Sequence, residues 1–445
     1  MHNLGRNRCF SLWLATFAKD HPFTFVDHTL RGGDSLVGLT AHQVEAFHWQ
    51  PKEEGALLRD MPSRLRHILN ARAQIFDAAD ETPYETLAQK LAVTEEQMID
   101  LRLAGDLTIA AFFAADKPQE RETRRKDLAE KFRRAQERVT DLELENELQG
   151  AVRVLKTGQI GITPFHWELE FPEVFRLNEH GSRASGFNAF VGNPPFLGGK
   201  KISTNLLPTY RDWLATMFEN SNSNSDLVCY FFRRAFELLN LQGGLGLIAT
   251  NSVSQGATRA TGLYYIVKHG GEIFAARKRV AWPGEAAVEV CIIHIWSGPF
   301  YGARYLNGRA VANISAFLVE KGGDDDPFVL RQNAGKSFIG YELHGIGFMF
   351  DDRSGEANPM SVLEDLAARN PSVRERVFPF IGGAEVNENP IGRYPRLAMN
   401  FGSMTLDEAL QWRELVDLLR QKVKPTRPAR SIIGTGGNIN VRDPK

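Results

Sequence analysis

The chain has 445 residues, of which 43% are apolar, and a formal net charge of −1. This length leaves room for two or three domains, and the neutral balance excludes a histone-like or coat-like nucleic-acid binder while still allowing a local basic groove. The three cysteines, Cys9, Cys229 and Cys291, lie far apart and form no metal-ligand or disulfide pattern. We therefore predict a cytoplasmic protein without a metal site, and also without a membrane segment, because no uncharged apolar run is long enough to cross a bilayer.

The first elements predict a domain that begins inside its own core. Residues 10–18 have the apolar character of a buried helix, and residues 23–26 that of a short buried strand leading to Gly33 and Asp34. No polar cap or leading strand precedes the helix. We therefore expect an upstream part of the domain to be missing from this chain.

The composition changes between about residues 52 and 150, where charge-rich helices predominate. A heptad-like seam runs for about two heptads and suggests a helical hairpin that packs on its parent domain. An oligomerising coiled coil would need more heptads, and remains the alternative. The seam consists of Leu128, Phe132, Ala135, Val139 and Leu142.

After Gly150 strands and helices alternate. We predict a strand over residues 187–191 and a helix over residues 226–240, which Asp226 caps and Gly243-Gly244 ends. Three further apolar runs predict strands, the last two joined as a hairpin, so that half of a doubly wound α/β sheet closes with a β-hairpin. These runs cover residues 245–249, 272–276 and 288–296. Beyond residue 300 the signals weaken, residues 322–327 have the composition of a linker, and the tail lacks a closing element.

The most informative stretch is Asn193-Pro194-Pro195-Phe196, which directly follows the strand over residues 187–191. Ligands of open α/β sheets bind outside the carboxyl ends of the strands. Two consecutive prolines stiffen the backbone there, so that the Asn193 side-chain oxygen and the Pro194 carbonyl oxygen become two fixed acceptors. Such a pair could grip both hydrogens of an aromatic amine and expose the nitrogen lone pair, while Phe196 stacks on the ring. The alternative is a plain turn at the end of a strand.

The segment around this motif, residues 186–200, resembles the catalytic motif of γ-type adenine-N6 DNA methyltransferases, and in particular the type IIG restriction-modification methylase family. Five other segments resemble that family in the same order along the chain, the last of them the start of its DNA-recognition region. They are residues 27–36, 166–175, 247–252, 282–290 and 379–387.

This resemblance implies a class I (Rossmann-like) methyltransferase sheet with a helical insertion, incomplete at the N-terminus. Residues 1–50 would be the C-terminal part of the cofactor-binding half, residues 51–155 the insertion, residues 156–300 the catalytic half, and residues 301–445 a linker and the start of the target-recognition region. The implied reaction transfers a methyl group from S-adenosylmethionine to N6 of adenine in double-stranded DNA, as part of a restriction-modification system.

The resemblance also assigns residues. Asn193, Pro194, Pro195 and Phe196 would form the catalytic motif, and Asp34 would contact the adenine moiety of S-adenosylmethionine. Trp282 would line the pocket for the target base, although a Trp beside Pro-Gly is as often a packed loop anchor. Similarly, Asp34 could be a solvated turn residue. We expect three aromatic or histidine side chains to pack a connecting segment onto the sheet without touching substrate: His166, Trp167 and Phe171.

Two departures leave an alternative open. The family's glycine-rich methionine-binding loop and the acidic residue that holds the cofactor ribose have no match in this chain. An upstream polypeptide could supply them, or the chain could be an inactive remnant that keeps the fold and some DNA binding. A GDSL-type hydrolase with Ser35 as nucleophile is excluded, because His344 is the one histidine beyond residue 300 and Tyr341, not Asp, stands three residues before it.

Overall fold

The computed structural model divides the chain into two compact units, residues 1–327 and 328–445, which are described separately. The ranges that the structure describes are 27–51, 57–58, 60–79, 81–137, 141–175, 185–282, 289–326, 328, 331–333, 343, 345–388 and 396–426. The helix predicted over residues 10–18 and the strand predicted over residues 23–26 lie outside them.

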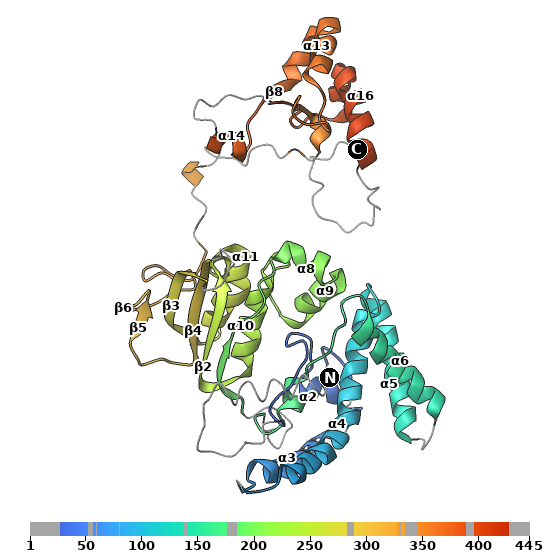
Figure 1. The fold of residues 1–445 in the computed structure, drawn as a ribbon, viewed down its shortest axis with the longest axis vertical. Helices are drawn as coiled ribbons and strands as arrows, with labels where there is room; N and C mark the ends of the chain where they lie inside the picture. The colour runs from blue at the N-terminus through green and yellow to red at the C-terminus, as the bar shows by residue number, and fades with distance from the viewer. Residues whose placement is uncertain are drawn as a thin grey trace. The chain divides into compact units, whose positions relative to one another are not determined.

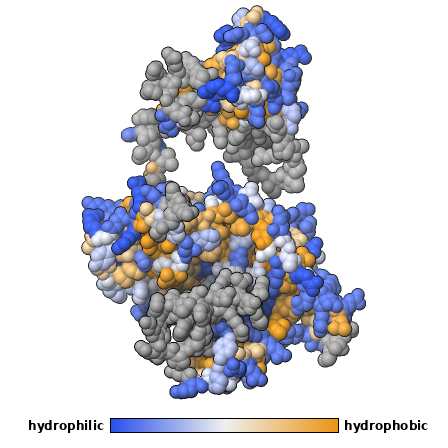
Figure 2. Space-filling model, viewed as in Figure 1, coloured by the Kyte–Doolittle hydropathy of each residue, from blue (hydrophilic) through white to orange (hydrophobic). Residues whose placement is uncertain are grey.

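Four helices form most of the first half of unit 1 (Figure 1): α3 (Met61–Phe76), α4 (Tyr84–Phe113), α5 (Pro118–Glu137) and α6 (Leu142–Thr157). The second half of α4 is almost entirely buried, and α5 and α6 pack along it. Phe132 joins the same core, which confirms the helical-hairpin interpretation. The seam does not continue into α6, because α5 ends at Glu137 and the Leu142 side chain is exposed; Val139 lies outside the described residues. Hydrophilic side chains predominate on the outer end of the hairpin (Figure 2).

A six-stranded mixed sheet forms the second half of unit 1, with the strand order β1-β2-β4-β3-β5-β6. Strand β1 runs parallel to β2, whereas β4 is antiparallel to both β2 and β3. The expected α/β fold is therefore confirmed, including the closing hairpin of β3 and β4. The strands are β1 (Phe187–Gly192), β2 (Leu239–Thr250), β3 (Gly271–Ala281), β4 (Glu289–Ser297), β5 (Arg304–Leu306) and β6 (Arg309–Val311).

Helix α10 (Leu227–Leu238) connects β1 with β2 and packs on the sheet. Its predicted cap is confirmed, because the Asp226 side chain accepts a hydrogen bond from the Val228 N–H. Its predicted end is wrong: β2 begins at Leu239 and includes both Gly243 and Gly244. A Cβ on Gly244 would lie 3.3 Å from the Trp296 ring, so this glycine serves the close approach of two strands and does not terminate the helix.

Shorter helices of unit 1 fill the connections around the sheet: α2 (Ala41–Glu45), α7 (Trp167–Glu170), α8 (Gly199–Asn205), α9 (Pro208–Met217), α11 (Gly256–Arg259), a π-helical turn (Ala260–Tyr264) and α12 (Tyr265–Lys268). Among the described residues, no helix combines the length and the apolarity needed to cross a membrane.

Unit 2 has its own small core around a three-stranded antiparallel sheet with the order β7-β9-β8. The core includes Phe350, Trp412 and Leu415. Its strands are β7 (Met349–Phe350), β8 (Val377–Phe380) and β9 (Arg396–Met399), and its helices are α13 (Met360–Arg369), α14 (Gly383–Glu388), α15 (Leu406–Ala409) and α16 (Arg413–Lys422).

Candidate active site

The predicted catalytic motif forms an irregular loop between β1 and α8. Strand β1 ends at Gly192, and α8 begins at Gly199. Asn193 and Pro195 are exposed, Pro194 is buried, and Phe196 is half-buried against the core cluster beneath the sheet. The motif thus combines an exposed amide with a buried, conformationally restricted neighbour. We call residues 193–196 the corner.

The corner is anchored from α10. Asp226 Oδ1 accepts hydrogen bonds from the Leu197 N–H, at 3.2 Å, and from the Val228 N–H, at 3.1 Å. In return, the Leu227 N–H donates to the Leu197 carbonyl oxygen. The backbone after the corner also lies so close to residues 224 and 225 that a Cβ on Gly199 would be 2.3 Å from the Asn224 carbonyl carbon. The loop therefore cannot shift without disturbing the start of α10.

Other predicted residues lie at the same edge of the sheet. Because β4 is antiparallel to both β2 and β3, the carboxyl ends of β1, β2 and β3 all meet there. Asn251 directly follows β2, and its side-chain oxygen accepts a hydrogen bond from Cys291 Sγ. Trp282 directly follows β3 and is half-buried. It lies three strand spacings, or about 14 Å, from β1 across the sheet, so its place in a base pocket stays a prediction.

Asp34 occupies a loop that forms a parallel bridge with Pro164. Its carboxylate accepts hydrogen bonds from the Leu36 N–H and from the Tyr210 hydroxyl, which lies 2.9 Å from Oδ2 and 3.1 Å from Oδ1. Burial raises the pKa of Asp34, although these hydrogen bonds partly offset that effect. Burial, and then the charge of Asp34, raise the pKa of Tyr210, which keeps the phenol a donor. Asp34 is therefore a held, half-buried acceptor and not a solvated turn residue.

Two indoles hold the loop that carries Asp34. Trp167 Nε1 donates to the Ser35 carbonyl oxygen, and Trp213 Nε1 donates to the Leu36 carbonyl oxygen. The Trp167 ring also packs edge-on against Phe187 and Phe190 of β1. Phe171 packs against Phe187 in the same way. The expectation that Trp167 and Phe171 pack this connecting segment onto the sheet is confirmed.

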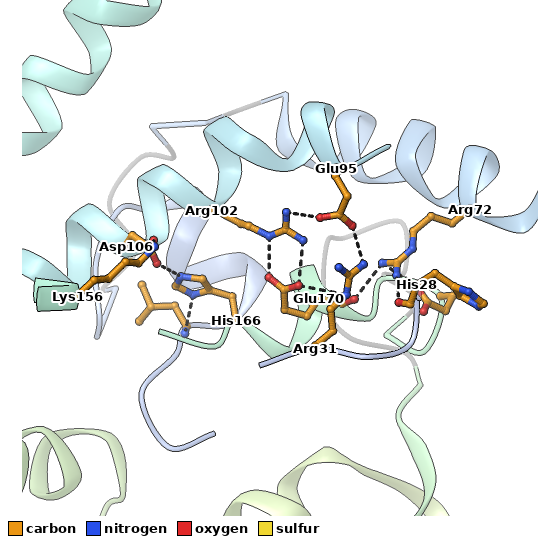
Figure 3. Close-up of polar contacts among 11 residues, drawn as sticks. His28, Arg31, Arg72, Glu95, Arg102, Asp106, Lys156, His166 and Glu170 are labelled. Carbon is orange, nitrogen blue, oxygen red and sulfur yellow. Dashed lines mark hydrogen bonds and ion pairs between the residues drawn. The ribbon is translucent and has the colours of Figure 1, made fainter. Parts of the chain in front are cut away.

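His166 fixes the next part of the same loop from within the helical core (Figure 3). Its Nδ1 accepts a hydrogen bond from the Leu39 N–H, and its Nε2 lies 3.2 Å from Asp106 Oδ1. Lys156 donates to the other oxygen of Asp106. A Cβ on Gly105 would lie 2.4 Å from the His166 ring, so the ring is wedged between α4 and the loop.

An ion-pair network continues along α4 from this point (Figure 3). Arg102 donates to both oxygens of Glu170, at 2.7 and 2.9 Å, and also to Glu95. Glu95 and Glu170 in turn pair with Arg31, in the loop before Asp34. Hydrogen bonds to these carboxylates and their charges hold the pKa of Arg102 above its usual range despite its burial. Helix α4 therefore supports the Asp34 loop through this network.

The structure links the corner and Asp34 through a residue that the sequence analysis missed. The corner leads directly into α8 and α9, and Tyr210 in the first turns of α9 contacts Asp34. Asp226 was predicted only as a helix cap, and its bond to Leu197 was also missed. Asp226 is 29 residues from Leu197, and its role as a helix cap gave no signal of this second bond. Tyr210 is 176 residues from Asp34 and offers none.

The acceptor atoms of Asp34 fit one part of S-adenosylmethionine, its exocyclic amine. Tyr210 and Leu36 leave lone pairs on the Asp34 carboxylate, which can accept a further hydrogen bond from an exocyclic amine. Among the described residues, no group of three or more His, Cys, Asp or Glu side chains could hold a metal ion.

Comparison with known proteins gives a family and one solved structure. The model of the Eco57I restriction-modification methylase family matches residues 9–267. The chain is also similar to the type IIL restriction-modification enzyme MmeI, solved in complex with DNA, at 22% identity and a TM-score of 0.39 over 55% of this chain. The match covers 33% of the MmeI chain, so this chain spans only about a third of that structure. No curated protein matches it. Because the family model covers more than half of the sequence, the chain belongs to the Eco57I restriction-modification methylase family.

Proposed function

We propose that this chain is the catalytic part of a DNA methyltransferase that modifies N6 of adenine, with S-adenosylmethionine as cofactor and as part of a restriction-modification system. The observation that carries the proposal is the corner. An exposed Asn193 amide follows a parallel strand at the carboxyl edge of the sheet, beside a buried proline and a backbone anchored by Asp226. Membership of the methylase family supports the same reaction class.

The corner suits an aromatic amine. Asn193 Oδ1 and the Pro194 carbonyl oxygen each accept one of the two amine hydrogens, so the nitrogen becomes more tetrahedral and its lone pair is freed from the ring. S-adenosylmethionine, when bound, supplies the methyl group. After transfer the surplus proton passes to water, so no strong base is needed at the corner. The acceptors act most strongly as the nitrogen changes shape, which is where a catalyst gains rate.

The target base has to leave the duplex to reach these acceptors, at a cost of a few kcal/mol. Phe196 is placed to offset part of this cost by stacking, which is worth roughly 1–3 kcal/mol. The Phe196 ring is half-buried, so one part of it packs against the core while another part stays accessible to a base. On the cofactor side, Asp34 is proposed to accept a hydrogen bond from the adenine amine of S-adenosylmethionine.

The test is methyl incorporation from labelled S-adenosylmethionine into duplex DNA by Asn193→Ala. The chain is assayed alone and together with the product of any reading frame directly upstream, because no glycine-rich loop is recognisable in it. We expect kcat to fall on the order of 10²–10³-fold while DNA binding is retained. The matched control is Asn205→Ala, another exposed asparagine, in α8.

Two outcomes contradict parts of this proposal. If Asn193→Ala methylates DNA as fast as the parent, the corner is only a turn. If the parent binds DNA but incorporates no methyl groups in either format, the chain is an inactive remnant.

A further inference from the structure

Four exposed cations surround the carboxyl edge of the sheet. Lys200 and Lys201 lie in the first turn of α8, directly after the corner, and Arg277 and Arg279 lie near the end of β3. None of the four has an ion pair or side-chain hydrogen bond with any residue that the structure describes. Arg124 and Arg153 likewise have no ion pair with a described residue, whereas several other exposed cations of unit 1 are paired. On α5, for example, Arg133 pairs with Glu130 and Glu137.

Arg277 precedes an irregularity in β3, and Arg279 lies within it. Arg277 pairs with Ile292 and Val280 pairs with Val290, so two residues of β3, Lys278 and Arg279, stand opposite one residue of β4. Arg279 also adopts a φ of 54°, which a residue with a side chain rarely adopts. Such bulges bend a strand and redirect its side chains, and they are frequent beside active sites.

Strand register places this bulge beside the corner. Val280 pairs with Val290, which pairs with Thr250, and Gly192 pairs with Leu247, three residues earlier on β2. The bulge therefore lies about 10 Å beyond the end of β1 along the strands and about 14 Å across the sheet. Both distances are shorter than one turn of duplex DNA, which spans roughly 34 Å.

The four unpaired cations lie on both sides of a site that would accept an extruded base. Their charge and spacing are suited to binding phosphates. We propose that Lys200, Lys201, Arg277 and Arg279 form a clamp that binds the DNA backbone on both sides of the target adenine. This inference rests on the proposed function. In a chain whose net charge is −1, such a local cluster provides the attraction for DNA that the whole molecule lacks.

The experiment measures the affinity of a fluorescent duplex for the parent, for Arg277→Gln/Arg279→Gln and for Lys200→Gln/Lys201→Gln, between 50 and 200 mM salt. The logarithm of the affinity falls as the logarithm of the salt concentration rises, and each lost phosphate contact makes this slope less steep by about 0.9. We therefore expect the fourfold rise in salt to weaken either double variant about tenfold less than it weakens the parent. We also expect a raised KM for DNA with an unchanged kcat.

The matched control is Arg124→Gln/Arg153→Gln, which removes two exposed arginines from α5 and α6 without touching the sheet edge. This control should keep the parent's salt slope. If the edge variants also keep it, or if the control loses as much as they do, the clamp is wrong even when the parent methylates DNA. If the parent binds no DNA, both the clamp and the proposed function are wrong. The kcat of Asn193→Ala tests the proposed function alone, because it does not depend on the four clamp residues.

Discussion

Asp34 and Asp106 are two carboxylates of unit 1 that are largely withdrawn from water, but their partners differ. Asp106 lies against Lys156 at 2.6 Å and His166 at 3.2 Å. Although burial alone raises the pKa of Asp106, these partners lower it overall. Among the described residues, Asp34 has only the Tyr210 hydroxyl and backbone N–H groups, and burial raises its pKa.

The contrast separates a carboxylate held by its partners from the one that is proposed to contact the cofactor. Asp106 is compensated by the Lys156 ammonium and by a hydrogen bond with the His166 ring, so its charge stabilises the fold. Asp34 has no counter-ion among the residues that the structure describes, which costs stability and leaves its carboxylate available to a ligand. Proteins tolerate a local loss of stability at a functional site when other interactions compensate for it. Here the indole hydrogen bonds and the ion pairs around the Asp34 loop provide that compensation.

The largest effect should come from removing the compensated charge. Asp106→Asn leaves Lys156 without its partner and weakens the support of His166. Lys156 is exposed and can be hydrated, so the loss comes from the weakened hydrogen bonds to the buried carboxylate, each worth about 1.5–3 kcal/mol. We expect a loss of about 3 kcal/mol in the free energy of unfolding. Denaturant unfolding of the full chain measures it. Asp116→Asn, at an exposed position, is the control and should stay within about 0.5 kcal/mol of the parent. Equal stabilities of the two variants would remove the distinction drawn between Asp106 and Asp34.

A second, smaller effect tests the corner, which is held by close backbone packing and by the Asp226 side chain. Gly199→Ala would place a methyl group 2.4 Å from the Asn224 carbonyl oxygen, so the start of α8 must move. We expect a loss of about 1–3 kcal/mol in the free energy of unfolding, together with reduced methylation. Gly198→Ala is the control, because a Cβ there meets nothing within 4 Å. If both variants behave alike, close packing after the corner is not what fixes it.

The smallest effect is a dependence on pH. Because the pKa of Asp34 is raised in the folded chain, its contribution to stability is present at low pH and is lost as pH rises from its ordinary value of about 4 through the folded value. Asp34→Asn lacks this loss, so it should gain stability relative to the parent between pH 4 and pH 7. Asp106 has a lowered pKa, so its contribution is lost only as pH falls below its ordinary value of about 4 and should stay constant between pH 4 and pH 7. Unfolding midpoints of both variants across this range decide, and parallel profiles would contradict the assignment.

The sequence predicted those features that are determined by residues adjacent in the chain. The strand before the corner and the Asp226 cap follow from apolar runs and a capping side chain, and both are confirmed. The extent of α10 was wrong because Gly243 and Gly244 were taken as a stop signal, whereas they allow the close approach of strands. The Asp34–Tyr210 contact could not be predicted, since nothing local distinguishes Tyr210 from an ordinary core aromatic.

The hydrogen bonds that hold the Asp34 loop also set an order of folding. Asp34 and Leu36 receive donors from Tyr210 and Trp213, which lie 176 and 177 residues further along the chain. At a synthesis rate of 5–20 residues per second, roughly 9–35 seconds separate the emergence of the loop from that of these partners. The loop that would bind the cofactor is thus synthesised early, but the hydrogen bonds that hold it can form only much later. A growing chain would have to keep Leu36 and Val37, both fully buried in the finished protein, from other contacts for that whole interval.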